Sequence, residues 1–167
     1  GNLYYTIRMR YALPDELLNA RDEGIKLEYQ IIDTQTGELV NPANDKDSLL
    51  KLTSGKTYKA SIRIAASKAH DYLALRAPIP SGAEILDSSL VTTGTVEESS
   101  GNSWKHWLSN KTIHDNEVRF FWDSFASGAT TVEFTFRAAR RGVYPLPPVL
   151  AECMYEPETF GRGDGYL

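Results

Sequence analysis

Apolar and polar residues alternate along much of this chain, and the alternation predicts β-strands. Between residues 3 and 11 the odd positions are all apolar or aromatic, while the even positions are mostly polar. A β-strand sorts such residues onto two faces, whereas an α-helix would scatter them around its circumference. We therefore predict a strand over residues 3–11. A second strand is predicted over residues 25–31, where apolar residues again occupy the odd positions.

Further strands follow along the chain, separated by turn-forming residues. They are predicted over residues 38–40, 48–53, 58–64, 71–77, 113–122, 131–138 and 149–155. Thr34-Gln-Thr-Gly37 reads as a turn, and Pro78 and Pro80 end a strand because proline cannot donate a hydrogen bond to a sheet. Short strands with turns between them are typical of an all-β, two-sheet antiparallel β-sandwich.

One or two short helical segments are also predicted. Pro14 suits the first turn of a helix, acidic residues follow it and Gly24 can end it, so the helix candidate runs from Pro14 to Arg21. Residues 84–91 form a second candidate for a short helical turn. The core is expected to consist of the inward-facing strand residues Ile7, Leu27, Tyr29, Tyr58, Ile62, Ile64, Leu73, Leu75, Val118, Phe120, Trp122, Phe134 and Phe136.

Length, charge and cysteine content narrow the class of protein. At 167 residues the chain fits one domain over residues 1–167, which can bury a core without disulfides or metals. The net charge of −4 argues against nucleic-acid binding, which needs a basic surface. The sole cysteine, Cys153, cannot form an intrachain disulfide. No apolar run is long enough to span a membrane, and the start at Gly1 without Met or signal peptide leads us to expect an excised piece of a longer protein.

No residue pattern indicates catalysis. His114 and Asp115 are adjacent, but neighbours on a strand point to opposite faces, and no Gly-x-Ser-x-Gly turn exposes a nucleophile. His70, His106 and His114 lack the spacing of zinc ligands and have no cysteine pair beside them. We therefore expect a domain that is not an enzyme, with no catalytic residue, cofactor or metal.

The last quarter of the chain carries the most specific pattern. It runs from the strand over residues 131–138 through Arg140-Arg-Gly-Val-Tyr-Pro-Leu-Pro-Pro148 to Ala151-Glu-Cys-Met-Tyr-Glu-Pro-Glu158 and Gly161-Arg162. This order resembles the C-terminal domain of bacterial alpha-2-macroglobulin-like proteins, the large periplasmic protease traps. Their chains end on a strand followed by Arg-Ala, Gly, an aromatic residue, Pro-Pro, Ala-Glu, Met-Tyr, Pro-Glu and Gly-Arg. The segment from Tyr72 to Gly82 is also similar to a strand and turn of that family.

This resemblance implies a fold and a function. The fold would be a fibronectin- or macroglobulin-like sandwich, present here as a single C-terminal domain over residues 1–167 of a much larger protein. The parent would be a broad-spectrum endopeptidase inhibitor of bacterial host defence. In that family the terminal domain is non-catalytic, packs against the thioester domain and helps to hold the resting state. Glu156 stands where the thioester motif after a cysteine such as Cys153 needs Gln, so this chain does not itself carry the thioester.

The resemblance also implies partners, a location and a contact surface. The partners would be the thioester domain and neighbouring macroglobulin domains of the parent chain, with target proteases reached through the parent. The location would be the periplasm or cell envelope, where the parent could be a membrane-anchored lipoprotein. The expected interdomain contact consists of Met154, Tyr155, Glu156 and Pro157, at the end of the last predicted strand.

Two alternatives stay open. Met154 and Tyr155 could instead fill the core of this domain. The chain could also be a generic adhesion or carbohydrate-binding sandwich of a bacterial surface protein, for which Trp104 and Trp107 are the candidate aromatic contacts.

Overall fold

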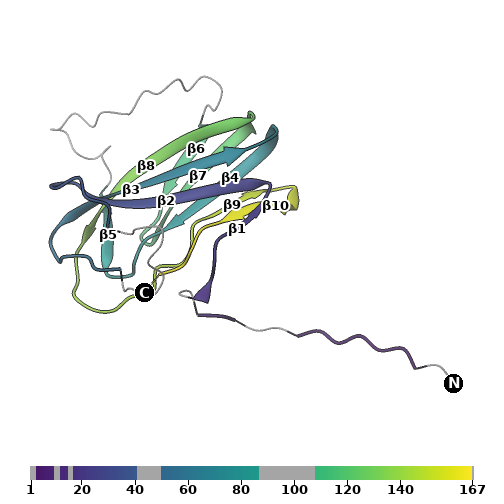
Figure 1. Cartoon of the computed structure of the whole chain (residues 1–167), viewed down its shortest axis with the longest axis horizontal. Helices are drawn as coiled ribbons and strands as arrows, with labels where there is room; N and C mark the ends of the chain where they lie inside the picture. Colours follow the sequence, from purple (N-terminus) through teal and green to yellow (C-terminus); the bar gives the residue numbers. More distant parts are fainter. Residues whose placement is uncertain (1–2, 10–11, 15–16, 41–49, 87–107, 167) are drawn as a thin grey trace.

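Ten β-strands in two antiparallel sheets form the described part of this chain (Figure 1). The computed structural model describes residues 3–9, 12–14, 17–40, 50–86 and 108–166. The strands are β1 (Arg21–Glu23), β2 (Ile25–Asp33), β3 (Thr57–Ala66), β4 (His70–Pro78), β5 (Ala83–Leu86), β6 (Asn110–Ile113), β7 (Glu117–Phe125), β8 (Gly128–Ala138), β9 (Leu150–Cys153) and β10 (Glu156–Arg162). The predicted all-β sandwich is therefore confirmed.

The strands divide between two sheets. Sheet A has the order β1-β10-β9-β4-β7-β6, and sheet B has the order β2-β3-β8-β5. All neighbouring strands run antiparallel. The chain passes from sheet A to sheet B at Gly24, between β1 and β2. The φ angle of 97° at this residue lies in a region that glycine adopts without a Cβ clash.

The core lies between the two sheets and is rich in aromatic residues. Every predicted core residue from Tyr58 onward in the sequence is buried. Phe120 of β7 and Phe134 of β8 bring their ring centroids within 6.4 Å, so the two sheets contact through these rings. Leu27 and Tyr29 of β2 are only partly buried and pack against the edge of this core.

The predicted strand and helix at the N-terminus are both wrong. Residues 3–9 belong to neither sheet, and Ile7, predicted in the core, is 78% exposed. Of the predicted helix, residues 15–16 lie outside the described residues, Leu17 lies in a single turn, and residues 18–20 are irregular and lead into β1. A helix this short is marginal without tertiary support. Here the backbone instead binds the C-terminal segment, because Asp164 accepts a hydrogen bond from Ala20 N at 2.9 Å.

Five other segments differ from the prediction. The strand predicted over residues 38–40 is reduced to an isolated bridge between Leu39 and Ile32 of β2. Residues 50–53 are irregular, and residues 48–49 lie outside the described residues. Residues 83–86 form β5 rather than a helical turn, because they pair with β8, and residues 87–91 are not described. The strand predicted over residues 113–122 is a hairpin, β6 and β7, which turns at residues 114–116. The strand predicted over residues 149–155 ends at Cys153, and β10 follows it.

A buried carboxylate joins two arginines on the outer face of sheet A. Glu117 accepts hydrogen bonds from Arg76 at 3.0 Å and from Arg119 at 2.6 Å, and its side chain is only 7% exposed. Arg76 and Arg119 are cross-strand neighbours, so the carboxylate also separates two like charges. Burial by itself would raise the pKa of Glu117, but the hydrogen bonds from Arg119 and Arg76 outweigh burial and the pKa is lowered.

A pH-dependent loss of stability is expected from Glu117. The pKa of Glu117 is lower in the folded than in the unfolded state, so its charged form stabilises the fold at pH values above the unfolded pKa of about 4.3. This contribution is lost as the pH falls through the folded pKa. Glu117→Gln should lower the free energy of unfolding by about 2 kcal/mol at pH 7. The difference from the unmodified protein should shrink towards pH 3. Urea denaturation at several pH values measures both effects.

The control for Glu117→Gln is Glu28→Gln. Glu28 also has two basic partners, Lys26 and Arg63, but its side chain is 42% exposed, so solvent screens the interaction and the change should be small. Equal effects of the two substitutions would show that the burial of Glu117 does not matter.

Candidate functional site

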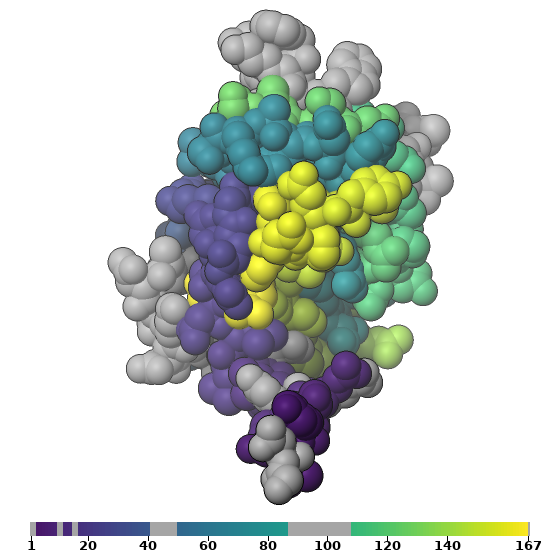
Figure 2. Space-filling model, turned by 90° about the vertical axis from the view of Figure 1, so that its right-hand side faces the viewer, coloured from purple at the N-terminus to yellow at the C-terminus, as the bar shows by residue number. Residues whose placement is uncertain are grey.

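Met154 and Tyr155 form the turn between β9 and β10 at one end of the sandwich. The prediction placed them at the end of the last strand. They instead follow β9 and precede a further strand, β10, but they do lie at a tip of the domain. Met154 is 56% exposed and Tyr155 is 76% exposed. The alternative in which these two side chains fill the domain core is therefore wrong. Figure 2 views this end of the molecule, where the C-terminal strands, in yellow, lie on the surface beside the violet N-terminal strands.

Tyr72 of β4 is part of the same surface, and sequence reasoning missed it. Its ring packs edge-on against Tyr155, with ring centroids 5.1 Å apart and planes at 83°. Its carbonyl oxygen accepts a hydrogen bond from Met154 N at 2.9 Å. These two contacts tie the turn to the sheet, so Tyr155 has a preferred orientation before any partner arrives.

The backbone of Tyr72 is strained. Its φ angle is 55°, in the left-handed region, where an L side chain costs about 1–2 kcal/mol. The strained residue lies inside the β4–β7 ladder, where its neighbours Asp71 and Leu73 pair with Ser124 and Trp122 of β7. Tyr72 is exposed, whereas Leu73, which follows it, is buried.

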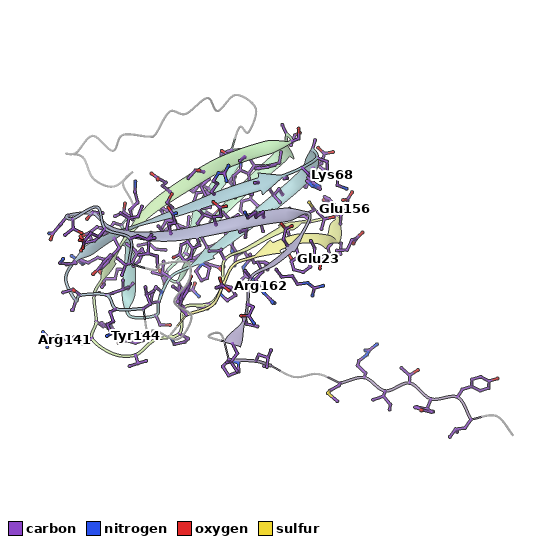
Figure 3. All side chains as sticks on the ribbon, in the orientation of Figure 1. Glu23, Lys68, Arg141, Tyr144, Glu156 and Arg162 are labelled. Atoms are coloured by element: carbon purple, nitrogen blue, oxygen red, sulfur yellow. The ribbon has the colours of Figure 1, made fainter. Side chains whose placement is uncertain are left out.

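Charged residues surround the aromatic turn. Glu156 follows Tyr155 directly and is exposed, as are Lys68 and Asp71. Figure 3 shows Lys68 and Glu156 at the same end of the sandwich. We call the set of Tyr72, Met154 and Tyr155 the aromatic tip. It is an apolar projection with a charged and mainly acidic margin.

Glu156 and Pro157 begin β10 and lie beside the aromatic tip. Both are exposed. The pairing of β10 with β9 shifts register between Glu156 and Phe160, so Pro157 lies where the ladder is irregular. A proline fits such a position because it has no N–H to donate. The four predicted contact residues are therefore contiguous on the surface at the start of β10.

Cys153 lies just inside the tip and is part of the core. Burial is the main factor that raises the pKa of its thiol, and Glu156 and Asp71 raise it further. A buried thiol of raised pKa is a poor nucleophile. Cys153 therefore acts here as a small apolar residue of the core.

The histidines considered for chemistry do not come together. His70 is opposite Phe125 at one end of the β4–β7 pair, while His114 precedes Glu117 at the other end. His106 lies outside the described residues, as do Trp104 and Trp107. Among the described residues no cluster of three His, Cys, Asp or Glu side chains is placed to hold a metal. Nor does the described part of the chain contain a helix long and apolar enough to cross a membrane.

An open groove lies at the opposite end of the sandwich. Its volume is about 490 Å³, and its walls include Leu52, Val143 and Leu146 with Arg140 and Arg141 at the margin. Arg141 and Tyr144 mark this end in Figure 3, far from Glu156. The Tyr144 ring covers Gly82 and Gly142, where any Cβ would collide with it. The groove contains none of the predicted contact residues.

Comparison with known proteins identifies similar chains. The family model described as the bacterial alpha-2-macroglobulin MG10 domain matches residues 24–158. An alpha-2-macroglobulin homolog of Nostoc sp. is 23% identical over 164 residues, which cover 97% of this chain and 8% of the relative. The chain thus spans a small part of the length of that relative.

Solved structures show the same fold. Escherichia coli alpha-2-macroglobulin activated by porcine elastase aligns with a TM-score of 0.73 at 18% identity, over 90% of this chain and 13% of the other. Salmonella alpha-2-macroglobulin reacted with methylamine aligns with a TM-score of 0.70 at 18% identity, over 90% of this chain and 9% of the other.

Proposed function

The chain belongs to the bacterial alpha-2-macroglobulin MG10 domain family, and we propose that it is the non-catalytic C-terminal domain of a longer protease inhibitor. In this proposal it packs against a thioester domain and neighbouring macroglobulin domains of its parent and helps to hold the resting state. The parent works in the periplasm or cell envelope as a broad-spectrum trap. The observation that carries the contact role is the aromatic tip, in which Met154 and Tyr155 project into solvent at one end of the sandwich.

The shape and chemistry of the tip support insertion into an apolar pocket. Methionine adapts to irregular cavities, and tyrosine offers a flat ring with a polar end. The ring of Tyr72 packs on Tyr155, and the carbonyl oxygen of Tyr72 accepts a hydrogen bond from Met154 N. Because these contacts already hold the turn in place, little conformational freedom is lost on docking. Exposed apolar groups that are held rigidly are typical of contact surfaces.

The proposed role is to keep water away from the thioester. Hydrolysis needs water at the acyl carbon, and an apolar side chain that fills the opening of the pocket excludes it. Among the similar solved structures, the Salmonella protein was reacted with methylamine and the E. coli protein was activated by porcine elastase. The charged margin, including Glu156 and Lys68, would lie at the rim of the contact and would set its orientation.

The test is the double substitution Met154→Ala with Tyr155→Ala. Because both side chains are exposed, the melting temperature of the isolated chain should change by less than about 2 °C. In the full-length parent the same change should release the thioester thiol at least about tenfold faster, which corresponds to a loss of ~1.4 kcal/mol from the barrier. Thiol release is followed with a chromogenic thiol reagent.

Two further variants make the test specific. Val143→Ala removes an exposed apolar side chain at the other end of the sandwich and should leave thiol release unchanged. Tyr72→Ala removes the ring that orients Tyr155 and should give an intermediate rate. A parent that keeps its normal thioester lifetime after loss of Met154 and Tyr155 would rule out the locking role.

A further inference from the structure

The most unusual surface of this molecule is its N-terminal segment, residues 3–9. Its large side chains, Leu3, Tyr4, Tyr5, Ile7 and Met9, are between 76% and 88% exposed. Figure 1 shows the segment extending away from both sheets, and Figure 2 shows it projecting from the lower part of the domain. Within the described residues it forms no hydrogen bond or ion pair with the sandwich. A soluble domain rarely exposes so many neighbouring apolar side chains unless something else covers them.

The pattern of the segment is that of a strand with one buried face. Leu3, Tyr5, Ile7 and Met9 occupy alternate positions, while Thr6 and Arg8 lie between them. Such alternation matches an antiparallel strand that packs one face on a core and turns the other to solvent. The segment therefore has the sequence of a sheet strand but no sheet in its own domain to join.

The family match supports a boundary between this segment and the sandwich. The MG10 model matches residues 24–158, so the segment lies 14 residues or more before the match, whereas β1 and the end of β10, which also lie outside the match, adjoin it directly. The alignment with the longer Nostoc protein covers 97% of this chain, so the segment is included at least in part in a relative that has many more residues. A piece that recurs in long chains but lies outside this domain is suited to contact a neighbouring domain.

We infer that residues 3–9 form a β-strand that joins the open edge of a sheet in a neighbouring domain of the same parent chain. Backbone hydrogen bonds to the edge strand would give the affinity, and the odd-numbered side chains would complete the apolar core of that domain. This inference relies on the proposed function only for the existence of a longer parent.

The anchoring of the segment limits where the partner sheet lies. The chain first binds the sandwich at residues 18–20, where Leu18 O accepts from Gly165 N at 3.0 Å and Arg162 donates to Asn19 O at 3.1 Å. Residues 10–17 separate this anchor from the proposed strand and can span at most about 30 Å. The partner sheet must therefore lie within that distance of the anchor. In this inference residues 10–17 are a short linker between the two domains, and this connection does not involve the aromatic tip.

Hydrogen exchange tests the proposal in the full-length parent and in this chain alone. In the isolated chain the amides of residues 3–9 should exchange at the rate of an unstructured peptide. In the parent they should be protected by at least about a hundredfold, because the strand would be hydrogen-bonded within a folded sheet. Absence of protection in the parent would overturn the inference.

Matched substitutions on the two faces of the segment provide the control. Ile7→Asp puts a charge on the proposed buried face and should abolish the protection of residues 3–9 in the parent. Thr6→Asp puts the same charge on the solvent face and should leave the protection intact. Neither should change the melting temperature of the isolated chain, where both residues are exposed. Equal loss of protection in both variants would contradict a one-faced strand.

Two other measurements separate the possible occupants and the two proposals. If the isolated chain dimerises in solution and Ile7→Asp alone abolishes the dimer, the segment binds a second copy and the assignment to a neighbouring domain is wrong. Thioester thiol release is measured on the same parent variants. Loss of protection with a normal thioester lifetime would show that the strand and the aromatic tip act independently, so failure of one proposal is distinguishable from failure of the other.

Discussion

Replacing Phe136 with alanine is expected to lower the free energy of unfolding by about 3–5 kcal/mol. Phe136 lies in β8, the central strand between β3 and β5, and is fully buried. Its ring stacks on Tyr58 with centroids 5.8 Å apart and contacts Phe134 with centroids 6.5 Å apart. Because β8 is paired on both sides, the backbone cannot close the cavity that the ring would leave. Urea denaturation of the isolated chain measures the change.

The control for Phe136→Ala is Thr131→Ala in the same strand. Thr131 is exposed, so its truncation should change the free energy of unfolding by less than about 0.5 kcal/mol. A transition midpoint that does not move in Phe136→Ala would mean that the inward face of β8 is assigned wrongly. The m-value should stay constant, since a change in the surface exposed on unfolding would confuse the comparison.

The interior of the fold could be predicted from the sequence because central strands show the clearest alternation. In β3, Tyr58, Ile62 and Ile64 are buried between polar neighbours, and each strand beside it imposes the same period of two. Register then follows, since a slip by one residue would turn every buried side chain to solvent. Edge elements were less predictable. The β10 strand begins with Glu156 and Pro157, which resemble a strand end, and only its pairing with β9 and β1 shows that it continues.

Residues 3–9 failed for a different reason. Their alternation is typical of a strand, yet they join neither sheet of this domain, because alternation says nothing about which sheet a strand joins. Pattern is a local property, whereas pairing depends on the rest of the chain. Ile7 was therefore placed wrongly in the core of this domain, and its exposure is the basis for our inference that the segment joins another domain.

The aromatic tip was predicted in part. The resemblance pointed to Met154 and Tyr155, and their exposure agrees with a contact surface. Tyr72 could not be found in this way, because it is 82 positions before Met154 and reaches it through the β4–β9 pairing. Its left-handed backbone also leaves no reliable trace in the sequence, since tyrosine rarely adopts it. Sites assembled from distant strands need the topology before their members can be recognised.

Gly161→Ala is expected to destabilise the fold by about 3 kcal/mol, the upper part of the range for overpacking. Gly161 lies in β10 of sheet A, where the strand passes close to the start of β2 in sheet B. A Cβ at this position would collide with the backbone carbonyl of Ile25 and press on Leu27. A backbone carbonyl cannot rotate away as a side chain can, so the two sheets would have to separate at this edge.

The matched control for Gly161→Ala is Gly37→Ala, which separates collision from backbone strain. Gly37 has a φ of 73° but open space where its Cβ would be, so only the cost of the left-handed backbone applies, about 1 kcal/mol. Denaturation of both variants should therefore rank Gly161→Ala as clearly the more damaging. If Gly161→Ala were no more harmful than Gly37→Ala, the close approach of β10 to β2 would not account for the glycine at position 161. A clearly larger loss of stability in Gly161→Ala would show that the two sheets need this close contact, which lies in β10, the strand that follows the Met154–Tyr155 turn.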